Sequence, residues 1–160
     1  MKFILDGMLG KLARWLRMMG HDVTYSTELS DDELLQTAKE ESRVLLTRDL
    51  ELYQRATARS IEAFYVEGLT EAERLTEMGA RFGIPLTIDL EKSRCPRCNT
   101  QLKTVPKNEI DDKVQPNTLK YYDEFWVCPN CGHVYWQGAH WSKIRATLKN
   151  AEEILGKKRA

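Results

Sequence analysis

The sequence contains no long apolar run and no excess of charge of either sign. An apolar stretch of only three residues, Phe3-Ile4-Leu5, precedes Asp6 near the start of the chain, which is shorter than the apolar core of a secretory signal. No run approaches the roughly 18 apolar residues of a membrane span. Basic and acidic residues number 24 each, so the chain is not basic throughout. This balance still permits local patches of either charge. We therefore expect a cytoplasmic protein without a membrane partner.

Cysteine is also scarce, and all four cysteines fall in two Cys-x-x-Cys pairs. Cys95 and Cys98 form the first pair, and Cys128 and Cys131 form the second. Two-residue spacing lets both thiolates of a tight turn reach one ion, so two such turns can complete a tetrahedral zinc site. Disulfides are disfavoured in a reducing compartment, and a redox motif would not need a second copy. Because four cysteines leave zinc no open position, we expect a structural zinc rather than a catalytic one.

Short apolar runs alternate with helix-like segments up to about residue 90. Strands are predicted at 2–5, 22–26, 43–47 and 61–68. Helices are predicted at 8–19, 30–42, 50–60 and 70–83. Ser30 and Glu33 form a capping-box pattern at the start of the second helix. Strands that alternate with helices of this length imply βαβ crossovers, so the predicted fold class is α/β with a mainly parallel sheet.

The pattern changes near residue 92. The segment 92–117 is polar, contains three prolines and lacks helical periodicity, so it is predicted to form an irregular connection that holds the first cysteine pair. An aromatic, hairpin-like segment surrounds the second pair, and the sequence from Ser142 onward predicts a helix with a basic end. The predicted organisation is a domain at 1–91, a zinc ribbon at 92–138 and a C-terminal helix at 139–160.

Two of the predicted strands end at an aspartate. Asp6 follows the first strand and Asp49 follows the third, while Asp31 and Asp32 begin the helix after the second. Ligands sit at the carboxyl ends of the strands in an open parallel sheet, so these acids could meet at one edge. Crowded carboxylates are tolerable when a cation joins them, and Mg²⁺ and Mn²⁺ prefer such ligands. The alternative is that each aspartate serves only as a turn or cap residue.

Several segments together resemble the Mut-seven carboxy-terminal RNase family, and they occur in the expected order over nearly the whole chain. These segments are FILDGMLGKLARWLRMMGHDVTY, DDELLQTA, RVLLTRDLEL, SRCPRCN and DEFWVCPNCGHVYWQGAHW. Members of this family resemble PIN-domain nucleases that carry a zinc ribbon near the C-terminus. The resemblance implies a three-layer PIN-like domain and a Mg²⁺- or Mn²⁺-dependent ribonuclease. Its metal-binding acids would be Asp6, one or both of Asp31 and Asp32, and Asp49, with Glu51 as the candidate for a fourth.

Basic and aromatic residues are the candidates for holding RNA. Lys11, Arg14 and Arg17 recur every third residue on the first helix, and Arg48 adjoins Asp49. Such cations could position phosphates beside the metal, whereas a solvated helix face is the alternative for Lys11 and Arg17. The aromatic pairs of the ribbon could stack on unpaired bases or could form the small core of the ribbon.

These inferences lead to two hypotheses of different classes. The first is a metal-dependent ribonuclease that hydrolyses phosphodiester bonds of single-stranded RNA at the aspartates, with a ribbon that aids RNA or partner binding. The second is a non-catalytic module with a nuclease-like fold that holds RNA or a ribonucleoprotein partner without cutting it.

Overall fold

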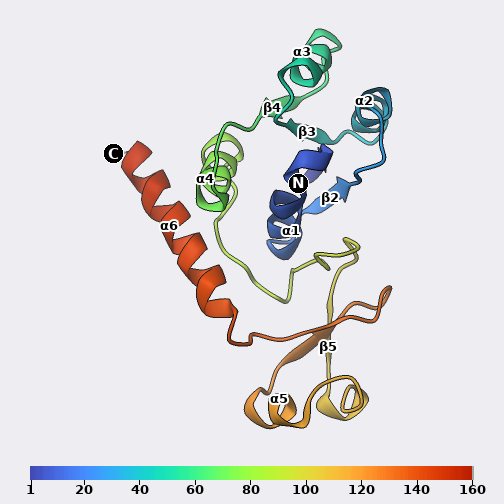
Figure 1. Ribbon diagram of the computed structural model, residues 1–160, viewed down its shortest axis with the longest axis vertical. Helices are drawn as coiled ribbons and strands as arrows, with labels where there is room; N and C mark the ends of the chain where they lie inside the picture. Colours follow the sequence, from blue (N-terminus) through green and yellow to red (C-terminus); the bar gives the residue numbers. More distant parts are fainter. Residues whose placement is uncertain (160) are drawn as a thin grey trace.

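The computed structural model describes residues 1–159. Its N-terminal part contains a sheet of four parallel strands in the order β2-β1-β3-β4 (Figure 1). The strands are β1 (Lys2–Leu5), β2 (Asp22–Tyr25), β3 (Val44–Thr47) and β4 (Ala63–Tyr65). The helices that connect and follow them are η1 (Gly7–Leu9), α1 (Gly10–Met18), α2 (Asp31–Glu40), α3 (Leu50–Ala58) and α4 (Glu71–Phe82). The predicted α/β class with a parallel sheet is confirmed.

The sheet is the middle of three layers. Successive side chains of a strand point to opposite faces, and β1 shows this directly. Phe3 and Leu5 belong to a core that includes side chains of α1 and α4, whereas Ile4 belongs to a second core beneath α2 and α3. All three side chains are fully buried. The strands are therefore apolar on both faces, as is typical of parallel sheets.

The ends of the helices follow from local sequence signals. Ser30 caps α2 and Thr70 caps α4, each in a capping box with the glutamate three residues later. Gly20 follows α1 with φ +96° and Gly83 ends α4 with φ +68°, which are left-handed conformations that glycine adopts without strain. Glycine at each of these positions therefore suits the end of its helix.

The residues around the cysteines form an antiparallel sheet in the order β5-β6-β7. Its strands are β5 (Lys103–Val105), β6 (Phe125–Val127) and β7 (Val134–Tyr135). The segment between β5 and β6 is more ordered than predicted, because it contains η2 (Lys107–Glu109) and α5 (Pro116–Tyr121). Ile110 and Val114 from this segment pack on Phe125 in a small separate core, which pattern analysis of so short and polar a segment does not reveal. Below, "ribbon" denotes residues 92–138 and "sheet domain" denotes residues 1–91.

The C-terminal helix α6 (Trp141–Arg159) returns to the sheet domain and lies beside α4 (Figure 1). Leu148, Ala151 and Leu155 join the core of the sheet domain. The Thr76 hydroxyl of α4 donates a hydrogen bond to the Ala151 carbonyl, at 3.1 Å. Ala160, the last residue of the predicted helix, lies outside the described residues.

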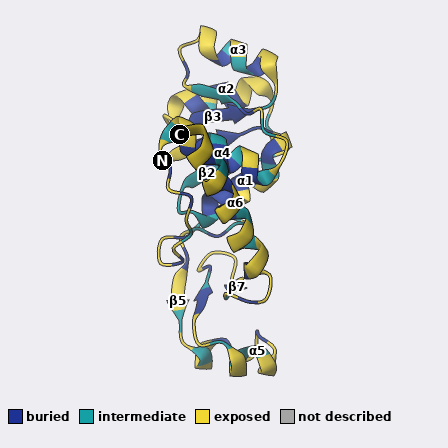
Figure 2. Cartoon of the chain, turned by 90° about the vertical axis from the view of Figure 1, so that its left-hand side faces the viewer, coloured by how far each residue is buried: buried dark blue, intermediate teal, exposed yellow. Residues whose placement is uncertain are grey.

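The ribbon forms the other end of an elongated molecule (Figure 2) and is tied to the sheet domain by polar contacts. The Arg17 guanidinium donates to the Val23 carbonyl of β2, at 2.8 Å, and to the Pro96 carbonyl of the ribbon, at 3.0 Å. Asn99 accepts from the Val23 N–H, at 3.0 Å, and donates to the Asp22 carboxylate, at 2.8 Å. Arg17 is buried, so its predicted place on a solvated or phosphate-facing side of the helix is wrong. Arg17 instead connects the sheet domain to the ribbon, which are the two lobes of the molecule.

None of the helices in the described residues combines the length and the apolar character that crossing a bilayer requires.

Candidate functional site

The strand order places Asp6 and Asp49 beside the topological switch point of the sheet. The chain moves from β1 outward to β2 and then returns to β3 on the other side of β1, so the crossovers diverge between β1 and β3. Asp6 follows the last residue of β1, and Asp49 lies two residues beyond the end of β3. Ligands of open α/β sheets bind outside the carboxyl ends of the strands at such a point.

Asp6 is a buried carboxylate held by three donors. It is 6% exposed. Its Oδ1 accepts from the Met8 N–H at 2.9 Å, and its Oδ2 accepts from the Arg48 N–H at 3.0 Å and from the Thr47 hydroxyl. A carboxylate offers about four acceptor positions. Three are therefore used to fix its orientation, and one on Oδ1 remains.

Thr47 connects the ends of the two central strands. Its hydroxyl donates to Asp6 and accepts a hydrogen bond from the Asp49 N–H, at 2.9 Å. Asp49 in turn caps α3, because its carboxylate accepts from the Leu52 N–H at 3.2 Å. Sequence reasoning missed Thr47, although a threonine that ends an otherwise apolar strand is a signal that could have identified it. Its side chain is fully buried, and buried hydroxyls are normally hydrogen-bonded.

Asp31 and Asp32 are paired with a cation from α3. Arg55 forms a hydrogen-bonded ion pair with Asp32 and lies 3.7 Å from Asp31. Both aspartates are exposed, and so is Glu51 in the first turn of α3. Within residues 1–159, no three acidic side chains bring their carboxylate oxygens within 4.8 Å of one another. The structure therefore links the Asp6 carboxylate to the Asp49 backbone N–H through the Thr47 hydroxyl. It places Asp31 and Asp32 in a separate group with Arg55.

The predicted phosphate-binding cations lie in two different environments. Lys11 and Arg14 are exposed on α1. Arg48 is half-buried, and its guanidinium donates to the carbonyls of Val66 and Gly68, at 3.0 and 2.9 Å. Its side chain therefore holds the segment after β4 against the end of β3, while its backbone N–H donates a hydrogen bond to the Asp6 carboxylate.

The four cysteines gather into one set that could hold zinc. Their sulfur atoms all lie within 4.8 Å of one another. The Cys95 and Cys131 sulfurs are 3.7 Å apart, and the Cys98 and Cys128 sulfurs are 3.3 Å apart. Four sulfurs around zinc with bonds of about 2.3 Å would be separated by roughly 3.8 Å. The donor set and its spacing therefore fit a closed tetrahedral site.

Each cysteine pair sits on the same kind of turn. The N–H of Asn99 donates to the Cys95 carbonyl and that of Gly132 donates to the Cys128 carbonyl, both at 2.8 Å. Both residues have positive φ, +72° for Asn99 and +78° for Gly132. Glycine and asparagine are the residues that adopt this conformation most readily. A glycine directly after the second Cys-x-x-Cys pair is a sequence signal for this turn, whereas the equivalent role of Asn99 was not anticipated.

Hydrogen bonds around the sulfurs suit thiolate ligands. The Tyr135 hydroxyl lies 3.0 Å from the Cys95 sulfur. Hydrogen bonding with Thr100 lowers the pKa of Cys98 to about 5. A low thiol pKa favours the thiolate, which is the form that binds metal.

Fold and site together define the class of this protein. It is a doubly wound α/β domain with a buried aspartate at its switch point and an attached four-cysteine ribbon. A family model, the Mut7-C RNAse domain, matches residues 1–148. The chain therefore belongs to the Mut7-C RNAse domain family, and the resemblance drawn from the sequence is confirmed. The family implies a nuclease-type function with RNA as the substrate. Comparisons with curated proteins and with solved structures gave no match.

Proposed function

We propose that the protein is a Mg²⁺- or Mn²⁺-dependent ribonuclease that hydrolyses single-stranded RNA at the carboxyl edge of its sheet. The observation that carries this proposal is the connection of the Asp6 carboxylate to the Asp49 backbone N–H through the Thr47 hydroxyl at the switch point. A buried carboxylate is costly unless its charge has a use or a partner. Here the donors are arranged around Asp6 so that one acceptor position stays free.

The available carboxylates fit the coordination that Mg²⁺ prefers in proteins. This ion keeps several waters and is commonly bound by one or two carboxylates together with substrate phosphates. Asp6 and Asp49 would hold it, and Asp31 or Asp32 would join only after release from Arg55. A bound ion would activate water and neutralise charge on the phosphodiester.

Basic side chains near the acidic edge would orient the RNA substrate. Lys11 and Arg14 are exposed on α1, the helix that begins directly after Asp6 and η1. Cations on this face can bind phosphates and fix the register of a strand without reading its sequence. Arg48 would act as a positioning residue, because it binds the backbone on either side of the edge.

Zinc in the four-cysteine site would have a structural role. All four ligand positions are cysteines, so the ion would have no open position for a substrate. The turn around Cys95 and Cys98 also supplies Pro96 and Asn99, which bind the sheet domain. Zinc would therefore hold the ribbon in place for RNA or partner binding.

One observation favours the second hypothesis, a module that binds RNA or a ribonucleoprotein partner without cutting it. No three acids gather at the edge within the described residues, and Arg55 already neutralises part of the charge of Asp31 and Asp32. A site that cannot recruit these acids could hold RNA but would lack a complete set of metal ligands.

Cleavage of a labelled single-stranded RNA in Mn²⁺ or Mg²⁺ distinguishes the two hypotheses. Asp6→Asn and Asp49→Asn should each lower the rate more than roughly a hundredfold, because even partners outside the coordination sphere change metal affinity or activity 10- to 100-fold. Asp112→Asn is the matched control, since Asp112 is an exposed acid of the ribbon. RNA binding without cleavage in either ion would favour the binding module.

A further inference from the structure

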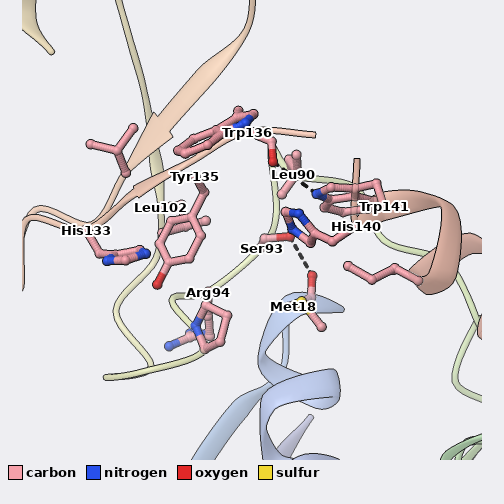
Figure 3. A pocket seen from close by; sticks show the side chains of 13 residues that line it. Met18, Leu90, Ser93, Arg94, Leu102, His133, Tyr135, Trp136, His140 and Trp141 are labelled. Atoms are coloured by element: carbon pink, nitrogen blue, oxygen red, sulfur yellow. Dashed lines mark hydrogen bonds between the residues drawn. The ribbon is translucent and has the colours of Figure 1, made fainter. Parts of the chain in front are cut away.

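A cavity of about 290 Å³ lies where the ribbon, α1 and α6 meet. Met18 contributes to its floor from the end of α1, and Trp141 and Ile144 contribute from the start of α6. Figure 3 shows the rings of Tyr135, Trp136 and His140 around this space, with Arg94 and Met18 on another side. Small-molecule pockets start at roughly 300 Å³, so the volume suits a group the size of a base or nucleoside.

The walls combine aromatic rings with positive charge. Three aromatic side chains line the cavity, Tyr135, Trp136 and Trp141, and no aspartate or glutamate does. Arg94 and His140 are among the remaining polar lining residues. An aromatic site without carboxylates complements a planar ring attached to a phosphate, and it disfavours a cationic ligand.

His140 has polar atoms that the protein does not use. His140 is exposed, and within the described residues its ring nitrogens make no hydrogen bond to the protein, whereas the Trp141 indole donates to the Trp136 carbonyl at 3.1 Å. The backbone of Gly138 keeps His140 and Trp136 close. A Cβ at this position would lie 2.9 Å from the Trp136 indole nitrogen and 3.5 Å from the His140 ring. The loop is therefore shaped around these two side chains.

One face of α1 leads from the acidic edge to this cavity. Residues three, four and seven apart share a helix face, so Lys11, Arg14 and Met18 lie along one side. Met18 lines the cavity, while Lys11 and Arg14 are exposed. The helix has nine residues, which is a length of about 13 Å. A single strand with phosphates on Lys11 and Arg14 could therefore span from Asp6 to the cavity within a few nucleotides.

We propose that this cavity binds one unpaired nucleobase of the RNA, with Trp136 and Tyr135 as its aromatic walls and His140 and Arg94 as its polar contacts. The proposal rests on the proposed function for its ligand, because RNA is the polymer that the acidic edge would cut. It assigns the ribbon a specific task, which is to hold a base several nucleotides from the scissile phosphate.

The test is equilibrium binding of a labelled single-stranded RNA to the zinc-loaded chain without added Mg²⁺ or Mn²⁺, measured by fluorescence anisotropy. Base–aromatic stacking corresponds to roughly five- to a hundredfold in affinity. Trp136→Ala should weaken binding at least about fivefold, Trp136→Phe should retain most of the affinity, and His140→Ala should weaken binding measurably. Tyr121→Ala is the control, since Tyr121 is a 76% exposed aromatic residue of the ribbon outside this cavity.

Abasic substitution along the RNA identifies the base itself. Removal of one particular base should weaken binding to the unmodified chain but not to Trp136→Ala. Three results would overturn the proposal. They are equal RNA affinity in all the variants, an equal loss of affinity on base removal in the unmodified protein and in Trp136→Ala, and no RNA binding at all. Equal RNA binding is also the result expected if the cavity instead receives an aromatic side chain of a protein partner. RNA that is bound through this cavity and not cleaved in Mn²⁺ would contradict the proposed hydrolysis alone.

Discussion

A single hydroxyl, that of Thr47, links the two acids at the centre of the candidate site. Thr47 is fully buried and sits at the last position of β3. It donates to the Asp6 carboxylate and accepts from the Asp49 N–H. Buried polar networks of this kind fix geometry when every member is satisfied, and they become costly when one member is removed. The position of Asp6 relative to Asp49 therefore depends on a residue that would bind neither metal nor RNA.

We predict that Thr47→Val separates the two acids while leaving the core filled. Loss of the hydroxyl leaves a buried acceptor and a backbone donor without their partner, which should lower the free energy of unfolding by about 1–3 kcal/mol. Cleavage should fall roughly 10- to 100-fold, as expected for a partner outside the coordination sphere. Urea unfolding and a cleavage assay measure the two effects.

Thr76→Val is the matched control for this prediction. Thr76 is also fully buried, but its hydroxyl joins α4 to α6 instead. It should destabilise the chain without a specific loss of activity per folded molecule. Equal activity losses in the two variants would show that Thr47 has no particular connection with the site.

His21 makes the stability of the sheet domain sensitive to mild acid. Burial, which is the largest cause, together with the nearby amino terminus and Arg94 lowers the pKa of His21 from 6.5 to about 4. The unfolded chain therefore binds a proton at a higher pH than the folded chain does. The corresponding stabilisation is complete above about pH 6.5 and is lost as the pH falls toward 4. His21→Gln should show a smaller loss of unfolding free energy over this window, measured by urea titration at several pH values; an unchanged pH slope would contradict the assignment.

The aspartates of the site could be predicted from single residues, but their partners could not. Asp6 and Asp49 stand directly after apolar runs, so the ends of the strands identified them. The pairing of Arg55 with Asp31 and Asp32 joins two helices that are distant in the sequence. The burial of Arg17 likewise depends on the ribbon carbonyl of Pro96. Such partners depend on tertiary contacts, which local patterns do not encode.

At the scale of whole elements, α6 packs on the sheet domain although it follows the ribbon in sequence. Leu148, Ala151 and Leu155 extend the core that α1 and α4 form over one face of the sheet. Gly79 of α4 permits close approach, because a Cβ there would lie 3.0 Å from a methyl carbon of Leu155. The chain therefore leaves the sheet domain, forms the ribbon and returns, so that the ribbon is held at both of its ends.

Leu155→Ala should test this arrangement. Leu155 is buried in the shared core, so its truncation should lower the free energy of unfolding by about 2–3 kcal/mol through lost burial and a cavity. Lys149→Ala, on the exposed side of α6, should change it by less than about 0.5 kcal/mol. Denaturant unfolding of the full chain gives both values. A Leu155→Ala variant as stable as Lys149→Ala would show that α6 does not pack on α4 in solution.

The elements of the sheet domain were predictable because local signals agree with the fold. The strand 43–47 is apolar because β3 is buried on both faces, and the capping box at Ser30 marks the start of α2. The helix α5 was not predicted, because six residues show too little periodicity and its stability comes from contacts in the ribbon core. The fourth strand is shorter than the predicted 61–68 and ends at Tyr65.

At the scale of the molecule, two lobes are joined by the turn that carries the first cysteine pair. Pro96 and Asn99 of this turn contact Arg17 and Val23 of the sheet domain. A metal that fixes the turn would therefore fix the orientation of the lobes as well. Folding of small metal sites is coupled to metal binding, so loss of the ion should release these contacts.

Removal of zinc should unfold the ribbon and leave the sheet domain folded but less stable. The purified chain should contain one zinc per molecule, and Cys131→Ser should bind it more weakly. Limited proteolysis after chelation should cut within 99–127, and added zinc should restore protection. A chain that has lost its zinc, verified by metal analysis, and yet keeps its thermal unfolding and cleavage pattern would contradict a structural role for the site.

The central claim is that Asp6 and Asp49 hold a divalent cation at the switch point of the sheet. A crystal structure of the zinc-loaded chain soaked in Mn²⁺, analysed by anomalous scattering at the manganese edge, tests it directly. The account predicts a manganese peak bonded to the Asp6 carboxylate and within reach of Asp49, with waters completing its coordination. A fully soaked crystal with no manganese at this edge, or with manganese bound only elsewhere, would contradict the claim.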